Sequence, residues 1–131
     1  MKSKITLAAR VIMGLIFVVF GLNGFLQFIP MPPLPDAAGQ FLGALAGSGY
    51  FFPVLKISEI VCGLALLSGQ FVPLALTVLA PIVLNIVLFH LFLAPGGLAL
   101  PIVLLIAGIY LATAYKSSFS SVLDREATPD D

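Results

Sequence analysis

Residues 5–29 read ITLAARVIMGLIFVVFGLNGFLQFI, a continuous apolar run with few polar interruptions. Its polar residues are Thr6, Arg10, Asn23 and Gln27. A transmembrane helix needs roughly 20 apolar residues to cross about 30 Å of hydrocarbon, so this run is long enough to span a bilayer. Lysines precede it, as in a signal peptide, but the run is too long for a signal peptide's apolar region and no small-residue cleavage site follows. We therefore predict a membrane-spanning helix.

The composition of the whole chain also indicates a lipid environment. Hydrophobic residues make up 60% of the 131 residues, and charged residues only 9%. A soluble domain has about half its residues apolar and about a quarter charged, so this chain has too little polar material to coat a water-soluble globule. The length suits one domain. The net charge is zero and no basic run with interleaved aromatics occurs, so we expect no nucleic-acid partner.

Three further apolar runs, residues 52–68, 71–93 and 98–115, are the other predicted spans. The second span is short for a full crossing and is followed by a predicted tight turn at Gly69. Pro81 lies inside the third span and should kink it, because proline removes a helix hydrogen bond and clashes one turn back. We predict an all-α fold, a polytopic transmembrane four-helix bundle.

Residues 30–36, PMPPLPD, separate the first two spans. Four prolines in this stretch forbid a continued α-helix, so we predict an extended linker. Asp36 suits the N-cap of a short helix over residues 37–46, which Gly47 and Gly49 would end. We interpret this segment as an interfacial or re-entrant helix packed over the extracytoplasmic end of the bundle.

Basic residues predict the orientation, because cytoplasmic flanks of membrane spans are enriched in lysine and arginine. The basic residues outside the spans or at their ends are Lys2, Lys4, Arg10, Lys116 and Arg125. With four spans, all five lie on one side, and the loops over residues 30–50 and 94–97 carry none. We predict a multi-pass protein of a bacterial-type inner membrane with both termini in the cytoplasm. Residues 1–116 would form the membrane domain, and residues 117–131 a polar cytoplasmic tail that we expect to be disordered.

This topology gathers polar residues in the outer leaflet. They are Asn23 and Gln27 of the first span, Lys56 and Glu59 of the second, and Asn85 and His90 of the third. Asn23 and Gln27 share a helix face, and Lys56 and Glu59 are close enough in sequence to touch. Asn85 and His90 point about 140° apart, so we rank Asn85 above His90 as a member of one pocket. The convergence predicts a polar site in the outer half of the bundle.

Each of these residues has both a structural and a functional interpretation. Charged residues in hydrocarbon cost a few kcal/mol each and are usually paired, so Lys56 and Glu59 form either a structural ion pair or a ligand or proton site. Asn23, Gln27 and Asn85 serve as hydrogen-bonding contacts between helices or as ligand contacts. We predict Glu59 and Lys56 as the chemically active pair, with Asn23, Gln27, Asn85 and His90 around a ligand.

Metal and thiol chemistry have little support in the sequence. His90 has no second histidine or cysteine at ligand spacing, so we predict no metal site. Cys62 is the only cysteine, which excludes an intrachain disulfide or a C-x-x-C redox pair. We interpret it as a small buried packing residue. Gly14 and Gly21 lie on one face of the first span and should allow close approach of another helix.

Several of these residues together resemble the DoxX-like family of small membrane proteins. The similar features are Arg10, Gly14 and Gly21-x-x-Gly24, then Pro53-x-x-Lys56-x-x-Glu59-x-x-x-Gly63 with Gly69, and the stretch from Asn85 to His90. The resemblance covers residues 4–115 and implies a four-helix membrane bundle. Members of the family are associated with membrane redox systems, including a thiosulfate:quinone oxidoreductase subunit and partners of oxidative-stress enzymes, and distant relatives act in protein maturation or as membrane chaperones. The resemblance implies no particular catalytic residues for this chain. The paired cysteines through which some relatives act have no counterpart in this sequence.

The first functional hypothesis is an accessory subunit of a membrane redox or quinone-linked process. The polar cluster would bind a quinone head group, with Glu59 as proton acceptor or hydrogen-bond partner and Lys56 setting the charge. No haem, flavin or nicotinamide motif is visible, so an electron carrier would come from a partner redox protein or from the lipid phase. The alternatives are a non-enzymatic scaffold or assembly factor and a small-solute or lipid carrier. The protein could form a homo-oligomer under any of these three hypotheses.

Overall fold

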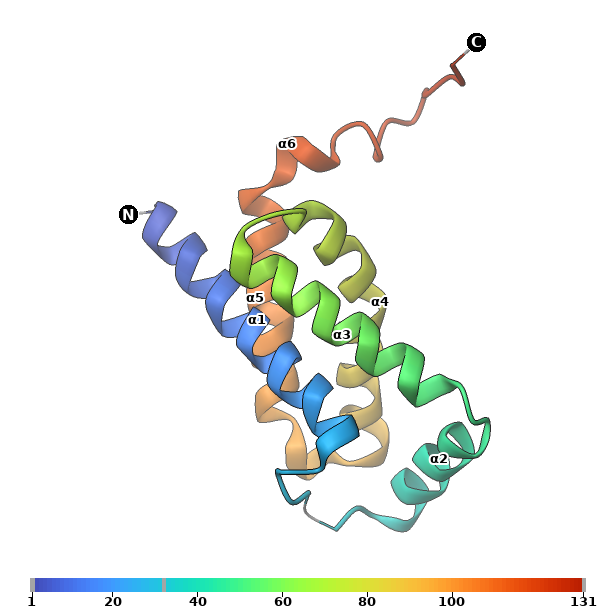
Figure 1. The fold of residues 1–131 in the computed structure, drawn as a ribbon. Helices are drawn as coiled ribbons and strands as arrows, with labels where there is room; N and C mark the ends of the chain where they lie inside the picture. Colours follow the sequence, from blue (N-terminus) through green and yellow to red (C-terminus); the bar gives the residue numbers. More distant parts are fainter. Residues whose placement is uncertain (1, 32, 131) are drawn as a thin grey trace.

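The computed structural model describes residues 2–31 and 33–130, which form helices and no strand (Figure 1). The elements are α1 (Lys2–Leu26), α2 (Asp36–Gly47), α3 (Phe51–Ser68), α4 (Val72–Leu93), the 3₁₀ helix η1 (Pro95–Gly97), α5 (Ala99–Ala114) and α6 (Lys116–Phe119). The predicted all-α class is confirmed. Pro32 of the predicted linker, Asp131 of the predicted tail and the Lys2 side chain lie outside the described part of the chain.

Three of the helices are long and apolar enough to cross a membrane. They are α1 over Ser3–Leu26, α3 and α4, with mean hydropathies of 2.4, 1.8 and 2.4. Large apolar side chains cover the outside of these helices, as in a protein solvated by lipid. The chain is therefore compatible with a multi-pass membrane protein. α5 is as apolar but has only 16 residues, about 24 Å of helix, so the four-span count remains a prediction.

Four helices pack around one apolar core. α1 lies against α3 and α5, and α4 lies against α3 and α5. The largest fully buried side chains include Phe17 and Met13 from α1, Leu66 from α3, Leu79 from α4 and Leu111 from α5. Figure 1 shows both chain termini at one end of the bundle and α2 at the other. The core therefore fixes two distinct ends of the molecule, and Asn23, Lys56 and Glu59 lie in the half toward α2.

Glycines allow α1 and α3 to pack with their backbones nearly in contact. A methyl group on Gly14 would lie 2.9 Å from the carbonyl oxygen of Gly63. In the same way, a methyl group on Gly63 would lie 2.9 Å from the carbonyl oxygen of Gly14. One on Gly21 would lie 2.7 Å from the Ile60 side chain. Backbone atoms cannot rotate out of the way, so any larger residue at Gly14 or Gly63 forces the helices apart. The predicted close approach at Gly14 and Gly21 is confirmed.

Two helix ends differ from the sequence prediction. α1 ends at Leu26, three residues before the predicted end, because Gln27 takes a left-handed conformation with φ of 51°. Asp36 lies inside the first turn of α2 and no side chain caps this helix, so the predicted N-cap at Asp36 is wrong. α2 nevertheless forms close to the predicted range and packs against α3 and α4, with the Phe41 and Phe89 rings 6.0 Å apart. Its position relative to a membrane remains a prediction.

The remaining boundaries lie within a few residues of those predicted. Gly69 ends α3 in a left-handed conformation with φ of 77°, which makes the predicted tight turn. Pro81 lies inside α4, which continues as α-helix on both sides of it, and the kink remains a prediction. The predicted tail begins with the single turn of α6, and Phe119 of that turn packs against the core. The bundle therefore extends a few residues beyond the predicted domain boundary at residue 116.

Candidate functional site

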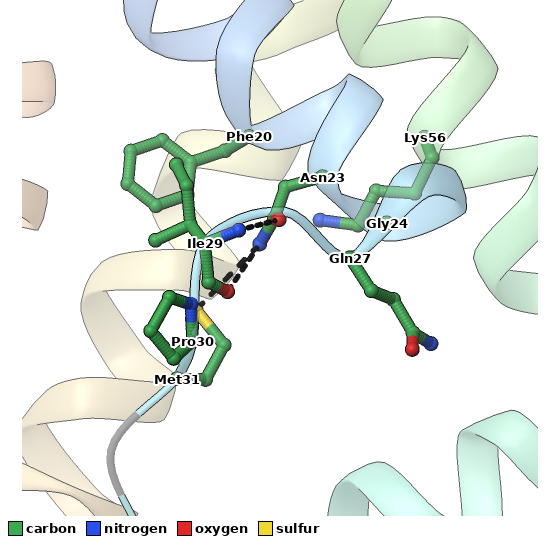
Figure 2. A pocket seen from close by; sticks show the side chains of 8 residues that line it. All are labelled: Phe20, Asn23, Gly24, Gln27, Ile29, Pro30, Met31 and Lys56. Carbon is green, nitrogen blue, oxygen red and sulfur yellow. Dashed lines mark hydrogen bonds between the residues drawn. The ribbon is translucent and has the colours of Figure 1, made fainter.

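A pocket of about 460 Å³ opens at the end of the bundle where α1 ends and α3 begins (Figure 2). It is lined by Phe20, Asn23, Gly24, Gln27, Ile29, Pro30, Met31 and Lys56. The helix α1 contributes one wall, the chain that follows α1 contributes the second, and a single side chain from α3 contributes the third. Three of the predicted site residues, Asn23, Gln27 and Lys56, therefore meet in one cavity.

Asn23 builds one wall of this pocket by holding the chain that leaves α1. The Ile29 backbone N–H donates to Asn23 Oδ1 at 2.7 Å, and Asn23 Nδ2 donates to the Ile29 carbonyl oxygen at 3.3 Å and to the Met31 sulfur at 3.8 Å. Asn23 is only 7% exposed. Both ends of its amide are thus engaged with the protein itself. Asn23 shapes the pocket, and the side chain has little capacity left for a ligand.

Lys56 reaches the pocket because α1 has no side chain at residue 24. A methyl group on Gly24 would lie 2.6–2.9 Å from the Cγ, Cδ and Cε atoms of Lys56. The aliphatic stem of Lys56 therefore lies directly across the backbone of α1, and its side chain is 22% exposed. Lys56 lines the pocket, and Figure 2 shows its ammonium end pointing toward the Asn23 carboxamide. An ammonium placed in this way can donate hydrogen bonds to a carbonyl or anionic group in the pocket.

Glu59 is the buried counter-ion of Lys56. Its Oε1 atom lies 3.3 Å from Lys56 Nζ, and the residue is 4% exposed. Lys56 is the only ionic partner of Glu59 in the part of the chain that the structure describes. Glu59 does not line the pocket itself, so it influences the cavity through the position and charge of Lys56. The predicted contact within this pair is confirmed.

Gln27 is the most accessible polar group of the pocket. Its left-handed backbone ends α1, and its side chain is exposed. In Figure 2 the carboxamide extends away from Asn23 and Lys56. No hydrogen bond engages this carboxamide within the described ranges. Its donors and acceptor are therefore available to a ligand at the mouth of the pocket.

The structure places Asn85 and His90 away from the pocket, which corrects two predicted site residues. Asn85 is exposed on α4, and its Nδ2 donates to the Pro81 carbonyl oxygen of the same helix at 2.8 Å. Two residues along an α-helix turn about 200°, so Asn85 points almost opposite to the buried Val83. His90 Nδ1 lies 2.8 Å from the Ile86 carbonyl oxygen, and its ring packs against Gly97 and Phe89. Neither residue lines the pocket, because Asn85 points away from the core and His90 lies against its own helix and the turn at Gly97.

Sequence reasoning missed the apolar walls of the pocket. Phe20, Ile29 and Met31 line it together with Pro30, and none of them stands out in an apolar sequence. Phe20 lies three residues before Asn23 and therefore on the same face of α1. This spacing could have predicted that Phe20 lines the pocket. The place of residues 29–31 depends on the hydrogen bonds of Asn23, and no local pattern predicts those. Gly24 was noted only as part of a motif, although its lack of a side chain admits Lys56.

The pocket combines one cation, one free carboxamide and apolar walls. This combination suits a ligand with a hydrogen-bond-accepting head and an apolar body. No group of three or more metal-binding side chains occurs among the described residues, and Cys62 is buried and unpaired in the core. Comparison of the chain with protein-family models, with curated proteins and with solved structures gives no match.

Proposed function

We propose that this protein is a DoxX-like inner-membrane protein whose outer-leaflet pocket binds a quinone head group or another small polar-headed lipophile. In this proposal the chain serves a membrane redox or quinone-linked process as an accessory subunit, and the electron carrier belongs to a partner or to the lipid phase. The observation that carries the proposal is the Lys56 ammonium, which is held by the buried Glu59 and borders an otherwise largely apolar pocket.

The proposed topology has four spans and both termini in the cytoplasm. Both ends of the chain lie at one end of the bundle, as an even number of crossings requires (Figure 1). α5 is the fourth crossing, extended by the apolar Leu98 before it and Tyr115 after it. The basic residues Lys4, Arg10 and Lys116 belong to the same end, which agrees with the enrichment of lysine and arginine in cytoplasmic flanks. The pocket then opens in the outer leaflet.

The chemistry of a quinone matches the pocket in size and in polarity. Small-ligand sites usually have volumes of about 300–1,000 Å³, are mostly apolar and carry a few polar groups that fix orientation. A quinone carbonyl would accept a hydrogen bond from Lys56 Nζ, and the ring would lie against Phe20 and Met31. Gln27 would contact the second carbonyl or a ring substituent at the mouth. Glu59 would hold the Lys56 ammonium in place through their ion pair, which makes Glu59 a positioning residue in this proposal.

A second candidate is a non-enzymatic scaffold or assembly factor. It is favoured by Asn23, whose amide is engaged with Ile29 and Met31 instead of facing a ligand. In this alternative the Lys56–Glu59 pair only fixes α3 against α1. The two candidates make opposite predictions for a change that removes the charge of Glu59 and keeps its shape.

The test is the affinity of the protein in lipid nanodiscs for a short-chain quinone, measured by calorimetry. We expect Glu59→Gln to weaken binding about tenfold or more, corresponding to about 1.4 kcal/mol. Glutamine can still accept a hydrogen bond from Lys56, so helix content should stay unchanged. The matched control is Glu126→Gln, an exposed residue of the tail, which should bind like wild type. No quinone binding by wild type, or equal binding by Glu59→Gln, would reject the quinone proposal.

A further inference from the structure

A stripe of six exposed residues runs along α4, on the side away from the core. It consists of Leu74, Val78, Pro81, Asn85, Leu88 and Phe92, which we call the α4 seam. The spacings between successive members are four, three, four, three and four residues. This is the heptad spacing by which two helices pack along a shared left-handed seam. α2 packs against α4 at Phe89, beside the seam and not on it.

Asn85 interrupts this apolar stripe at membrane depth. It is the fourteenth of the 22 residues of α4, so it lies about 20 Å from one end of the helix and about 12 Å from the other. Its only hydrogen bond goes from Nδ2 to the Pro81 carbonyl oxygen, which leaves Asn85 Oδ1 and one amide hydrogen without partners in the described chain. Unsatisfied polar groups in hydrocarbon are costly, because lipid tails offer no hydrogen bonds.

We propose that the α4 seam is the interface for a second copy of this chain, with Asn85 paired to Asn85 across a twofold axis. Two copies with the same orientation in a membrane can be related by a twofold axis along the membrane normal. The two α4 helices then run parallel, and each seam residue meets its own counterpart at equal depth. A carboxamide suits this position because it is both donor and acceptor, so two identical groups can bind each other.

The chemistry of the seam favours a second copy over an unrelated partner. A charged residue at the centre of the seam would require an opposite charge, which an identical copy cannot supply. Asparagine is self-complementary, and a single asparagine in an apolar heptad seam fixes the register between two parallel helices. Leu74, Val78 and Leu88 on either side would supply apolar packing. The inference does not depend on what the pocket binds, because the seam lies on a different face from the pocket.

The first test is disulfide cross-linking of the full chain in membranes, in a Cys62→Ala background that leaves no native cysteine. Leu88→Cys lies on the seam one turn from Asn85, whereas Leu91→Cys lies one turn nearer the end of α4 and off the seam. Both positions are exposed, at 39% and 52%. We expect mild oxidation to convert Leu88→Cys to a covalent dimer and to leave Leu91→Cys monomeric. Equal cross-linking at both positions, or none at either, would overturn the proposal.

The second test measures the contribution of the paired carboxamides. Asn85→Leu should raise the dimer dissociation constant in detergent by about 3- to 30-fold, the range expected for one hydrogen-bonded contact between membrane helices. Asn85→Gln keeps both donor and acceptor and should retain most of the dimer. The side chain is exposed in the single chain, so neither variant should unfold the bundle. A dimer constant that is unchanged by Asn85→Leu would contradict the proposed pairing.

Discussion

Replacing Gly63 by leucine is expected to prevent α1 and α3 from packing together. A single methyl group at this position would lie 2.7 Å from Val18 Cγ2, 2.9 Å from the Gly14 carbonyl oxygen and 3.0 Å from the Val18 backbone nitrogen. Two of these three contacts are with backbone atoms, which can move only if the helices separate. Overpacking of this kind costs roughly 1–3 kcal/mol and occasionally more, and we expect a loss of about 3 kcal/mol or more here.

The measurement is the free energy of unfolding in mixed micelles, followed by circular dichroism during titration with a denaturing detergent. The matched control is Gly43→Leu in α2, because a side chain at Gly43 would meet nothing within 4 Å. Leucine is the better helix former, so the control should be neutral or stabilised by up to about 1 kcal/mol. Equal stability of Gly63→Leu and Gly43→Leu would mean that α1 and α3 are not in backbone contact.

Replacing Lys56 by methionine is expected to destabilise the protein, and adding Glu59→Leu to restore it. Glu59 is 4% exposed and has Lys56 as its only ionic partner within the described chain. Removing one member of a buried pair leaves the other charge uncompensated, which costs about 3 kcal/mol. Replacing both members by apolar residues of similar size is often neutral or stabilising. Methionine also keeps the unbranched stem that lies across Gly24.

The same unfolding titration measures both variants, with Lys4→Met as the control. Lys4 is exposed near the start of α1, so its loss should change stability by less than about 0.5 kcal/mol. We expect Lys56→Met to be the least stable of the three variants and the double variant to approach wild type. A double variant as unstable as the single one would show that Glu59 or Lys56 makes contacts beyond their mutual ion pair.

Hydropathy and proline position predicted most of the fold. The ranges of α3 and α4 differ from the predicted spans by one residue at their starts, because an apolar run and its flanking turn residues are local signals. The end of α1 was predicted three residues late, since residues 27–29 are nearly as apolar as the helix itself. Only the left-handed conformation of Gln27 and the hydrogen bonds of Asn23 end the helix there, and neither is visible in hydropathy.

The candidate site was predicted in part, because the sequence gives the position of a residue along its helix more readily than the direction in which the side chain points. Asn23, Gln27 and Lys56 line a common pocket, as their predicted convergence implied. Asn85 points away from the core, and an almost wholly apolar helix offers no polar face from which that direction could be predicted. The close crossing at Gly24 determines which residues meet, and this crossing depends on the packing of α1 against α3.

The most direct test of the ligand pocket is native mass spectrometry of the protein extracted together with its own lipids. Wild type is compared with the double variant Lys56→Met, Glu59→Leu, after unfolding titrations have established that both are folded. We expect one stoichiometric quinone or similar polar-headed lipophile on wild type and its loss from the double variant. If both proteins carried the same amounts of non-selectively bound lipid, the result would contradict a ligand site at Lys56. It would favour the alternative function as a non-enzymatic scaffold.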